Sequence, residues 1–372
     1  MKVTHGQVLA WRLRQQGLAP RLTASAEELV ERLAGVQAQV PSAAELAVAV
    51  RQREPRPAGV EQALAARTLV RTWAMRGTLH LLAARHAPAY LSLMAAARTW
   101  EKPSWQRAFG VAPAQMAALG EAVEEVLDGP PLTRQELTEA LVARPGFAGL
   151  REQLTSGWGT VLKPLAWTGR LCNGPSRGTR TTTFTSPAAW LPDWPGLPDP
   201  EEAAAAVIPA YLGAHGPASP EVFDAWLIRG ASRKAQLRGW FAALGDGLAQ
   251  VEVDGVPGWL RAGDVDVLAA TDPSREVRLL PGFDQYVLGP GTADTRLIAA
   301  ERRKAVSRTA GWISPVVVFG GRVVGVWEFT DGVVDVRLFA EEGGVPEAGL
   351  EAEAARLAAC TGEVRTLSVR TV

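Results

Sequence analysis

The chain has 372 residues, 47% of them hydrophobic, and its 39 Lys and Arg residues balance its 39 Asp and Glu residues. This composition is typical of a folded globular protein, and no segment reaches the roughly 18 consecutive apolar residues that a membrane-spanning helix needs. The N-terminal stretch MKVTHGQVLAWRLRQ lacks the apolar region and small-residue cleavage site of a signal peptide. Cys172 and Cys360 provide neither a disulfide framework nor a zinc site. We therefore expect a soluble, cytoplasmic protein without a metal or another cofactor.

The neutral total conceals an uneven distribution of charge. Residues 1–190 carry 22 Lys and Arg against 14 Asp and Glu, whereas residues 191–372 carry 17 against 25. The first half is either an ordinary solvated surface with a biased composition or a surface that binds an anionic partner.

In chain order, the first predicted elements are three helices and a hairpin. Helices are expected over 4–16, from Ser25 onward and over 42–53, and Ser25 with Glu28 fits a capping box. The stretch TLVRTWAMRGTLHLL (68–82) alternates and then turns at Arg76-Gly77, which predicts a β-hairpin.

The same order recurs twice further along the chain. Helices over 114–127, 133–143 and 151–167, the second with a capping box of Thr133 and Glu136, precede two short strands in GRLCNGPSRGTRTTTF (169–184). Helices over 201–212, 219–226 and 233–244 precede a strand pair at 248–262. Three helices and a hairpin form the winged helix-turn-helix pattern, whose third helix normally meets DNA, and the repetition predicts a tandem array.

The last part of the chain has a β-rich pattern. Residues 275–372 contain Gly-Gly and Asp-Gly hairpin turns, with helices expected near 296–307 and 346–360. The predicted fold class is α+β, with winged-helix units at 1–110, 111–190 and 191–270 and a barrel-like or open-sheet module at 271–372. The proline-rich stretch LPDWPGLPDP (191–200) is the clearest linker.

Two glutamines stand out in the stretch LAGVQAQVPSAAE (33–45). Pro41 disfavours a helical conformation at Val40, and an extended backbone would put Gln37 and Gln39 on the same face. Their amides donate and accept hydrogen bonds but do not ionise, so they suit positioning rather than general-base catalysis. The alternative is that both amides cap the preceding helix or face water.

Four stretches together resemble the bacterial winged-helix DNA glycosylase family of AlkZ and YcaQ: GVQAQVPSAAELAVAVR (35–51), VRTWAMRGTLHLL (70–82), LLPGFDQYVLG (279–289) and VVVFGGRVVGVWE (316–328). The resemblance covers nearly the whole chain. It implies a C-shaped array of winged helices completed by a β-barrel, and removal of alkylated purines, including crosslinked ones. The family's catalytic pattern is a glutamine, an apolar residue, then glutamine or aspartate. It falls on Gln37, Ala38 and Gln39, so the resemblance makes Gln37 and Gln39 the expected catalytic residues.

The absence of a carboxylate in this pattern suits one class of lesion. An N7-alkylated guanine is cationic and leaves as a neutral base, so its glycosidic bond can break through an oxocarbenium-like sugar without protonation. Two amides then need only orient a water and stabilise charge. We expect a monomeric, monofunctional DNA glycosylase that acts on N7- or N3-alkylated purines and crosslinks in double-stranded DNA, in self-resistance or alkylation-damage repair. The alternative is a non-enzymatic winged-helix transcriptional regulator.

Basic residues around the first two hairpins are candidates for contact with DNA. Around the second hairpin four of them fall within eighteen residues, and no acid occurs from 153 to 192. The candidates are Arg71, Arg76, His80, Lys163, Arg170, Arg177 and Arg180. The alternative is that Arg76 is a solvated turn residue, that His80 is a hydrogen-bonded sheet residue, and that the second hairpin is a mobile, solvated loop. Asp284, in PGFDQY, belongs to the family resemblance and is expected to organise a turn or to support the site from behind.

Overall fold

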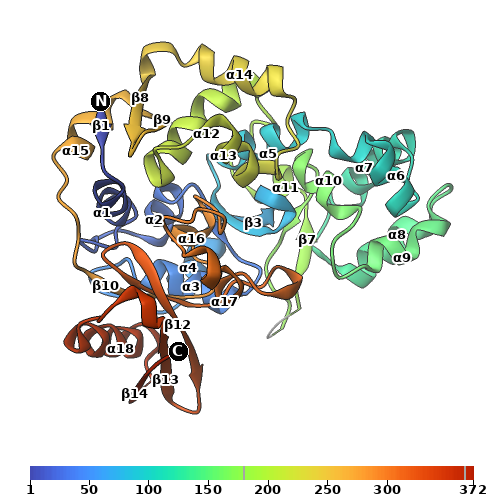
Figure 1. Cartoon of the computed structure of the whole chain (residues 1–372). Coiled ribbons are helices and arrows are strands. Elements are labelled where there is room, and N and C mark those ends of the chain that lie inside the picture. Colours follow the sequence, from blue (N-terminus) through green and yellow to red (C-terminus); the bar gives the residue numbers. More distant parts are fainter. Residues whose placement is uncertain (179–180, 364–365) are drawn as a thin grey trace.

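The computed structural model describes residues 1–178, 181–363 and 366–372 and mixes helices with small sheets, as the α+β prediction requires (Figure 1). The first part of the chain surrounds a three-stranded antiparallel sheet of order β2-β4-β3. The predicted hairpin is present, as is the capping box of Ser25 and Glu28. The helix predicted over 42–53 ends early, and α4 and α5 were not predicted. The elements are β1 (Lys2–Val3), α1 (His5–Gln15), α2 (Ala26–Arg32), β2 (Val36–Gln37), α3 (Pro41–Ala49), α4 (Gly59–Ala65), β3 (Leu69–Trp73), the 3-10 turn η1 (Met75–Gly77), β4 (Leu79–Ala83) and α5 (Ala87–Ala96).

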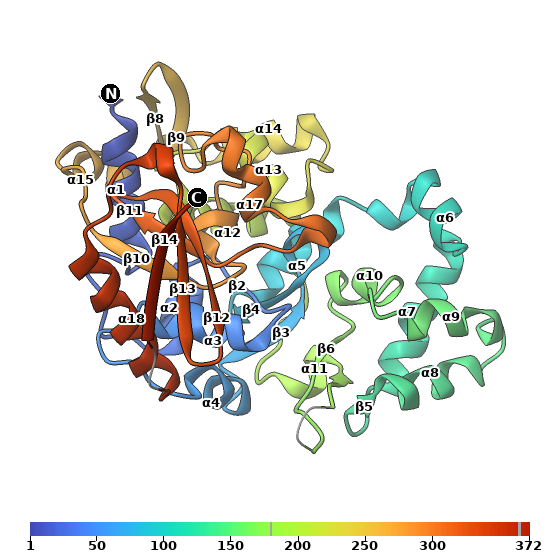
Figure 2. The same ribbon diagram turned by 60° about the horizontal axis from the view of Figure 1, so that its bottom comes forward.

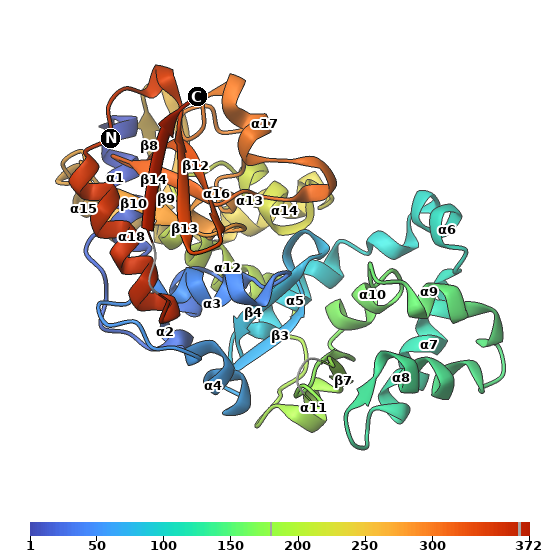
Figure 3. The same ribbon diagram turned by 90° about the horizontal axis from the view of Figure 1, so that it is seen from below.

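The second part projects to one side of the molecule, as Figures 2 and 3 show. The single helix predicted over 151–167 is wrong, because the chain leaves the helix after Thr155 and re-enters it at Leu162. Gly157 and Gly159 lie in this break; Gly159 has a φ of +66°, and glycine is a poor helix former. The elements are α6 (Pro103–Phe109), α7 (Pro113–Val126), β5 (Leu132–Thr133), α8 (Arg134–Val142), α9 (Arg151–Thr155), α10 (Leu162–Trp167), β6 (Cys172–Asn173), β7 (Thr183–Thr185) and α11 (Pro187–Trp190).

The third part matches its predicted order of three helices and a strand pair. Its sheet has an unexpected third member, because the N-terminal strand β1 pairs in parallel with β8. The first residues of the chain therefore lie beside a hairpin that begins at Leu248. The elements are α12 (Pro200–His215), α13 (Pro220–Ile228), α14 (Lys234–Ala243), β8 (Leu248–Val253), β9 (Val256–Arg261) and α15 (Val265–Ala269).

The last part is an open sheet and not a closed barrel. Among the described residues the five strands follow the order β10-β11-β12-β13-β14, which leaves β10 and β14 as edges. At the β10 edge, the Glu353 carboxylate of α18 accepts a hydrogen bond from the Leu279 backbone N–H at 3.2 Å. Because α18 covers this edge, β10 is protected from pairing with a further strand. The elements are β10 (Val277–Leu280), α16 (Gln285–Leu288), α17 (Arg303–Val306), β11 (Val316–Phe319), β12 (Arg322–Thr330), β13 (Val333–Leu338), α18 (Glu347–Thr361) and β14 (Thr366–Thr371).

The helix predicted over 296–307 is also largely wrong. Only residues 300–306 are helical, as a 3-10 turn followed by α17. The Leu297 carbonyl accepts a hydrogen bond from Val323 of β12 at 2.9 Å, and the Leu297 side chain is fully buried. Because the Leu297 carbonyl accepts this hydrogen bond from the sheet, it does not accept one from a backbone N–H further along a helix.

The first and last parts share one hydrophobic core. Leu9 and Leu13 of α1, with Leu18 after it, pack into the same cluster as the C-terminal sheet. The part of the chain that carries the two glutamines is thus fixed to the C-terminal sheet. Within the described ranges, no helix has both the length and the apolar character to cross a membrane.

Candidate active site

The two glutamines lie on an extended segment beside the first hairpin. In β2, Gln37 pairs with His80 of β4, and the Ala38 N–H donates to the Leu79 carbonyl at 2.7 Å. Val36 and Ala38 are buried in the core of the first part, so the two glutamines belong to the opposite face of the segment, as predicted from Pro41. Gln37 is only 6% exposed, whereas Gln39 is exposed.

The hairpin turn holds both side-chain carbonyl oxygens. Arg76 donates from Nη2 to Gln37 Oε1 at 2.9 Å and from Nη1 to the Trp226 carbonyl of α13 at 3.2 Å. The Leu79 N–H donates a longer bond, 3.4 Å, to Gln39 Oε1. Arg76 therefore fixes the Gln37 amide against the third part of the chain and leaves its N–H₂ group free of this contact. Gln39 is held more weakly and remains open to solvent.

Arg76 remains cationic at neutral pH although it is surrounded by protein. Burial, and then the charge of Arg229, lower the pKa of Arg76 to about 10. Its bond to Gln37 is therefore charge-assisted.

His80 lies beneath the glutamines rather than at the surface. Its side chain is fully buried, and burial, followed by the charge of Arg76, lowers its pKa to about 3. Nδ1 lies 3.0 Å from the Thr78 carbonyl, so the neutral ring donates there, and Nε2 finds no partner among the described atoms. The expectation that His80 meets DNA does not fit this placement, since a buried ring does not reach a ligand; we assign it to the packing behind Gln37.

Asp284 forms a buried ion pair with an arginine that the sequence analysis did not single out. Its two carboxylate oxygens accept from Arg51 Nη1 at 2.8 Å and Nη2 at 2.7 Å, and both side chains are fully buried. Oδ1 also caps α16 by accepting from the Tyr286 N–H at 2.8 Å. Arg51 lies two residues after the end of α3, so this pair ties the helix after the glutamines to the C-terminal part. The only signal in the sequence is a lone arginine that ends the apolar run ELAVAVR.

The candidate DNA-binding residues fall into separate groups. Lys163 lies against the hairpin turn, since a Cβ on Gly77 would be 3.5 Å from its Cδ, and so it joins Arg76. Arg71 projects from the opposite face of the sheet, in register with Leu81 instead of His80, and lines a separate cavity of about 290 Å³ with Ser176.

The other candidates lie farther along the second part and are paired with acids. Arg170 pairs with Glu124 at 3.1 Å and Arg177 with Glu136 at 2.6 Å. These acids belong to α7 and α8, which the acid-free stretch from 153 to 192 did not reveal. Arg180 lies outside the described residues.

Two cavities adjoin Arg76. One of about 520 Å³ is lined by α13 and the 288–293 loop, and it includes Glu221. Hydrogen bonds from its own backbone N–H and from Ser219 lower the pKa of Glu221, so it is ionised at neutral pH. Nothing in the sequence singles out this carboxylate, because it belongs to a helix far from the glutamines along the chain. The second cavity, of about 500 Å³, lies toward α10.

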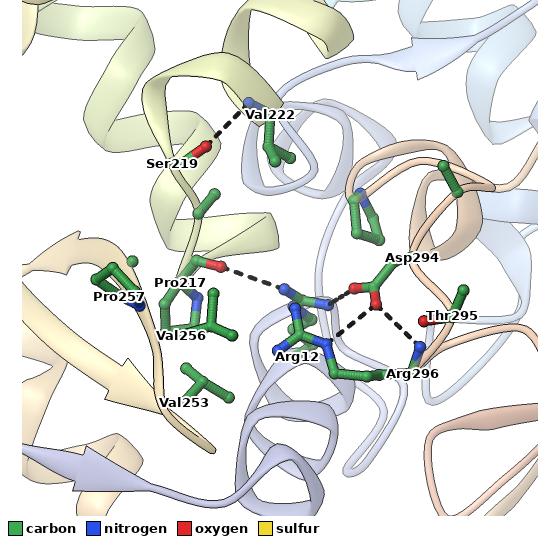
Figure 4. A pocket seen from close by; sticks show the side chains of 14 residues that line it. Arg12, Pro217, Ser219, Val222, Val253, Val256, Pro257, Asp294, Thr295 and Arg296 are labelled. Atoms are coloured by element: carbon green, nitrogen blue, oxygen red, sulfur yellow. Dashed lines mark hydrogen bonds and ion pairs between the residues drawn. The ribbon is translucent and has the colours of Figure 1, made fainter.

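A third cavity, of about 360 Å³, lies at the junction of α1, the β8–β9 hairpin and the 290–296 loop (Figure 4). The buried Arg12 donates from Nε to the Gly216 carbonyl at 3.0 Å and lies 3.8 Å from the Asp294 carboxylate. The two glutamines are not part of its lining. We interpret this cluster as a structural link between the first, third and last parts of the chain.

The fold and the glutamine site place this chain among known proteins. The family model of the AlkZ-like DNA glycosylases matches residues 30–360, and the chain belongs to this family. It is 52% identical to an interstrand DNA cross-link repair glycosylase of Streptomyces sahachiroi over 373 residues, which covers all of both proteins. The solved structure of the Streptomyces sahachiroi DNA glycosylase AlkZ superimposes with a TM-score of 0.96 over the full length of both chains. The resemblance seen in the sequence is thereby confirmed, and it favours a glycosylase over a transcriptional regulator.

Proposed function

We propose that this chain is a monofunctional DNA glycosylase that hydrolyses the N-glycosidic bond of cationic N7- or N3-alkylated purines and unhooks interstrand crosslinks. The observation that carries this is the pair Gln37 and Gln39, held by the first hairpin through Arg76 and Leu79. The close relationship to a cross-link repair glycosylase supports the crosslinked substrate.

In the proposed reaction the lesion supplies the driving charge. The bond from C1′ to purine N9 breaks, and its electron pair neutralises the cationic N7- or N3-alkylated base, which leaves uncharged. Gln39, with its weakly held carbonyl oxygen, accepts a hydrogen bond from the attacking water, and the free Gln37 N–H₂ donates to that water. The water adds to C1′ of the oxocarbenium-like sugar and its proton passes to solvent, which leaves an abasic site.

The proposed architecture is three winged-helix units, 1–110, 111–190 and 191–270, arranged as a C-shaped array whose concave side faces double-stranded DNA. The recurring order of helices and hairpins supports these units. Residues 271–372 form the fourth module. We propose that a monomer binds the duplex through Arg71, Arg76, Lys163, Arg170, Arg177 and Arg180, and that Asp284 supports α3 from behind. Action on chromosomal DNA, in self-resistance or alkylation-damage repair, places the protein in the cytoplasm.

The test is single-turnover release of N7-methylguanine from a duplex, with abasic sites revealed by alkali. We expect Gln37→Ala and Gln39→Ala each to slow release about 10²–10³-fold, by analogy with the loss of a charge-stabilising donor, while folding and DNA affinity change little. Gln39→Asp should retain activity, because the related YcaQ form carries aspartate there. Wild-type rates in both alanine variants would exclude the glutamines from catalysis.

Two controls define the role of charge. Glu221→Gln should leave the rate nearly unchanged, and a large loss would instead make Glu221 the group that activates water. Hypoxanthine, a neutral base, should not be released, because two amides provide neither an acid for the leaving base nor a strong base. Comparable release of hypoxanthine and N7-methylguanine would mean that an acid takes part.

A further inference from the structure

The cavity between Arg76 and α10 has an unusual lining. Four aromatic side chains, from α6, α10 and the turn before α10, surround about 500 Å³ of space together with two cations besides Arg76. We call it the aromatic cavity. These six residues are Trp105, Phe109, Trp158, Trp167, Lys163 and Arg229.

Trp158 is the most exposed large apolar side chain of the described residues, at 73% exposure. Its turn is nevertheless firmly anchored. A Cβ on the neighbouring Gly159 would lie 2.6 Å from the Trp73 ring of β3, so the turn packs directly on that strand. Arg134 of α8 donates to the Ser156 carbonyl at 2.9 Å. The fold thus holds an indole ring largely in solvent, where its flat face can receive a partner.

Two further rings and a lysine belong to the same lining. The partly exposed Trp105 and Phe109 rings meet edge to face, with centroids 4.9 Å apart. Burial and the nearby charge of Arg229 lower the pKa of Lys163, and no hydrogen bond from its ammonium group occurs within the described ranges. Aromatic faces combined with cations are the features that bind unstacked nucleic-acid bases beside a phosphate backbone.

The aromatic cavity adjoins the glutamine site through a single side chain. Arg76 lines the cavity and also donates to Gln37 Oε1 at 2.9 Å. A planar ring in the cavity would therefore be separated from the proposed reaction centre by about the length of the Arg76 side chain. Its volume falls within the range of pockets that enclose a small organic ring system.

We propose that the aromatic cavity is a stacking subsite for a planar aromatic ring carried by the DNA substrate, occupied while Gln37 and Gln39 act on the damaged nucleotide. This inference rests on the proposed function and adds a determinant of substrate choice to it. The ring is either an unstacked nucleobase or an aromatic substituent of the lesion, since both present the same flat surface. The three cations around the cavity favour nucleic acid over an apolar protein segment as the occupant.

The experiment compares Trp158→Leu with Trp158→Phe, which removes or retains an aromatic ring at this position. The probes are duplexes in which one guanine is replaced by a non-hydrolysable 7-deazaguanine that carries either a 7-methyl or a 7-benzyl group, and the measurement is Kd. We expect Trp158→Leu to weaken binding about tenfold, the loss of one stacked ring, and Trp158→Phe to retain most of the affinity. Because the side chain is exposed, both variants should melt at the wild-type temperature.

The two probes separate the two sources of the ring. An equal loss on both probes identifies a nucleobase as the occupant, whereas a loss confined to the 7-benzyl probe identifies the lesion substituent. Unchanged affinity for both probes, or a Phe variant as weak as the Leu variant, overturns the stacking subsite. Release of N7-methylguanine by the wild-type protein, measured in parallel, tests the proposed function separately, and the Kd comparison decides the subsite whichever way that assay ends.

Discussion

Arg76→Met should slow base release because it frees the Gln37 amide. In the wild-type protein the guanidinium bonds Gln37 Oε1 at 2.9 Å and the Trp226 carbonyl at 3.2 Å, which fixes the amide between two parts of the fold. A hydrogen bond to a charged group contributes about 1.5–3 kcal/mol. If that energy holds Gln37 in its reactive orientation, its loss lowers the rate about 10- to 150-fold. This effect is smaller than the one expected for Gln37→Ala.

A double-mutant cycle distinguishes this positioning role from a direct role of Arg76. The single-turnover rate is measured at saturating enzyme for Arg76→Met, Gln37→Ala and the double variant. If Arg76 acts through Gln37, the double variant is no slower than Gln37→Ala alone. Multiplicative losses would refute the reasoning and give Arg76 a role in the reaction that is independent of Gln37. Arg229→Met is a matched control, because it removes a cation from the same cavities without a bond to Gln37, and it should change affinity more than rate.

The remaining predictions concern stability and DNA affinity. Burial lowers the pKa values of His80 and His215 to about 3. Below pH 6.5 both histidines are therefore protonated in the unfolded chain, whereas in the folded chain they stay neutral until about pH 3. The free energy of unfolding, measured in urea, should therefore fall as pH decreases from 6.5, by about 1.4 kcal/mol per pH unit for each histidine, and His215→Gln should reduce this slope. Asp284→Ala leaves the Arg51 charge buried and alone and should cost about 3–5 kcal/mol in the same assay, whereas Asp284→Asn combined with Arg51→Met should recover part of it. A wild-type midpoint for Asp284→Ala would contradict the importance of that pair. Arg177→Ala should reduce the slope of log affinity against log salt by about one, and an unchanged slope would place this hairpin away from DNA.

The sequence predicts best those features that depend on neighbouring residues. Pro41 was enough to predict the extended segment that puts Gln37 and Gln39 on one face, and the capping boxes at Ser25 and Thr133 are both present. In each case the side chain that decides the conformation lies within three or four residues of the backbone that it affects.

Features that depend on distant contacts were not predictable in the same way. Arg76 and Gln37 are 39 residues apart, and nothing local to either one indicates their hydrogen bond. The choice between a barrel-like module and an open sheet stayed unresolved for a related reason, since the β-rich pattern of residues 275–372 does not reveal that Glu353 of α18 bonds the edge of β10. Tertiary partners thus decide both the orientation of the Gln37 amide and the open form of the sheet.

The pairing of β1 with β8 has a consequence for how the protein folds during its synthesis on the ribosome. Lys2 and Val3 are synthesised long before their partners Glu252 and Val253. Arg51 is likewise synthesised before its partner Asp284, which lies 233 residues further along the chain. At a synthesis rate of about 5–20 residues per second, this is a delay of roughly 10–50 s. During translation the glutamine segment therefore exists without the contacts that fix its helix. Nascent chains that stop before Asp284 should leave the ribosome as inactive proteins, even though they contain both glutamines and the hairpin that holds them.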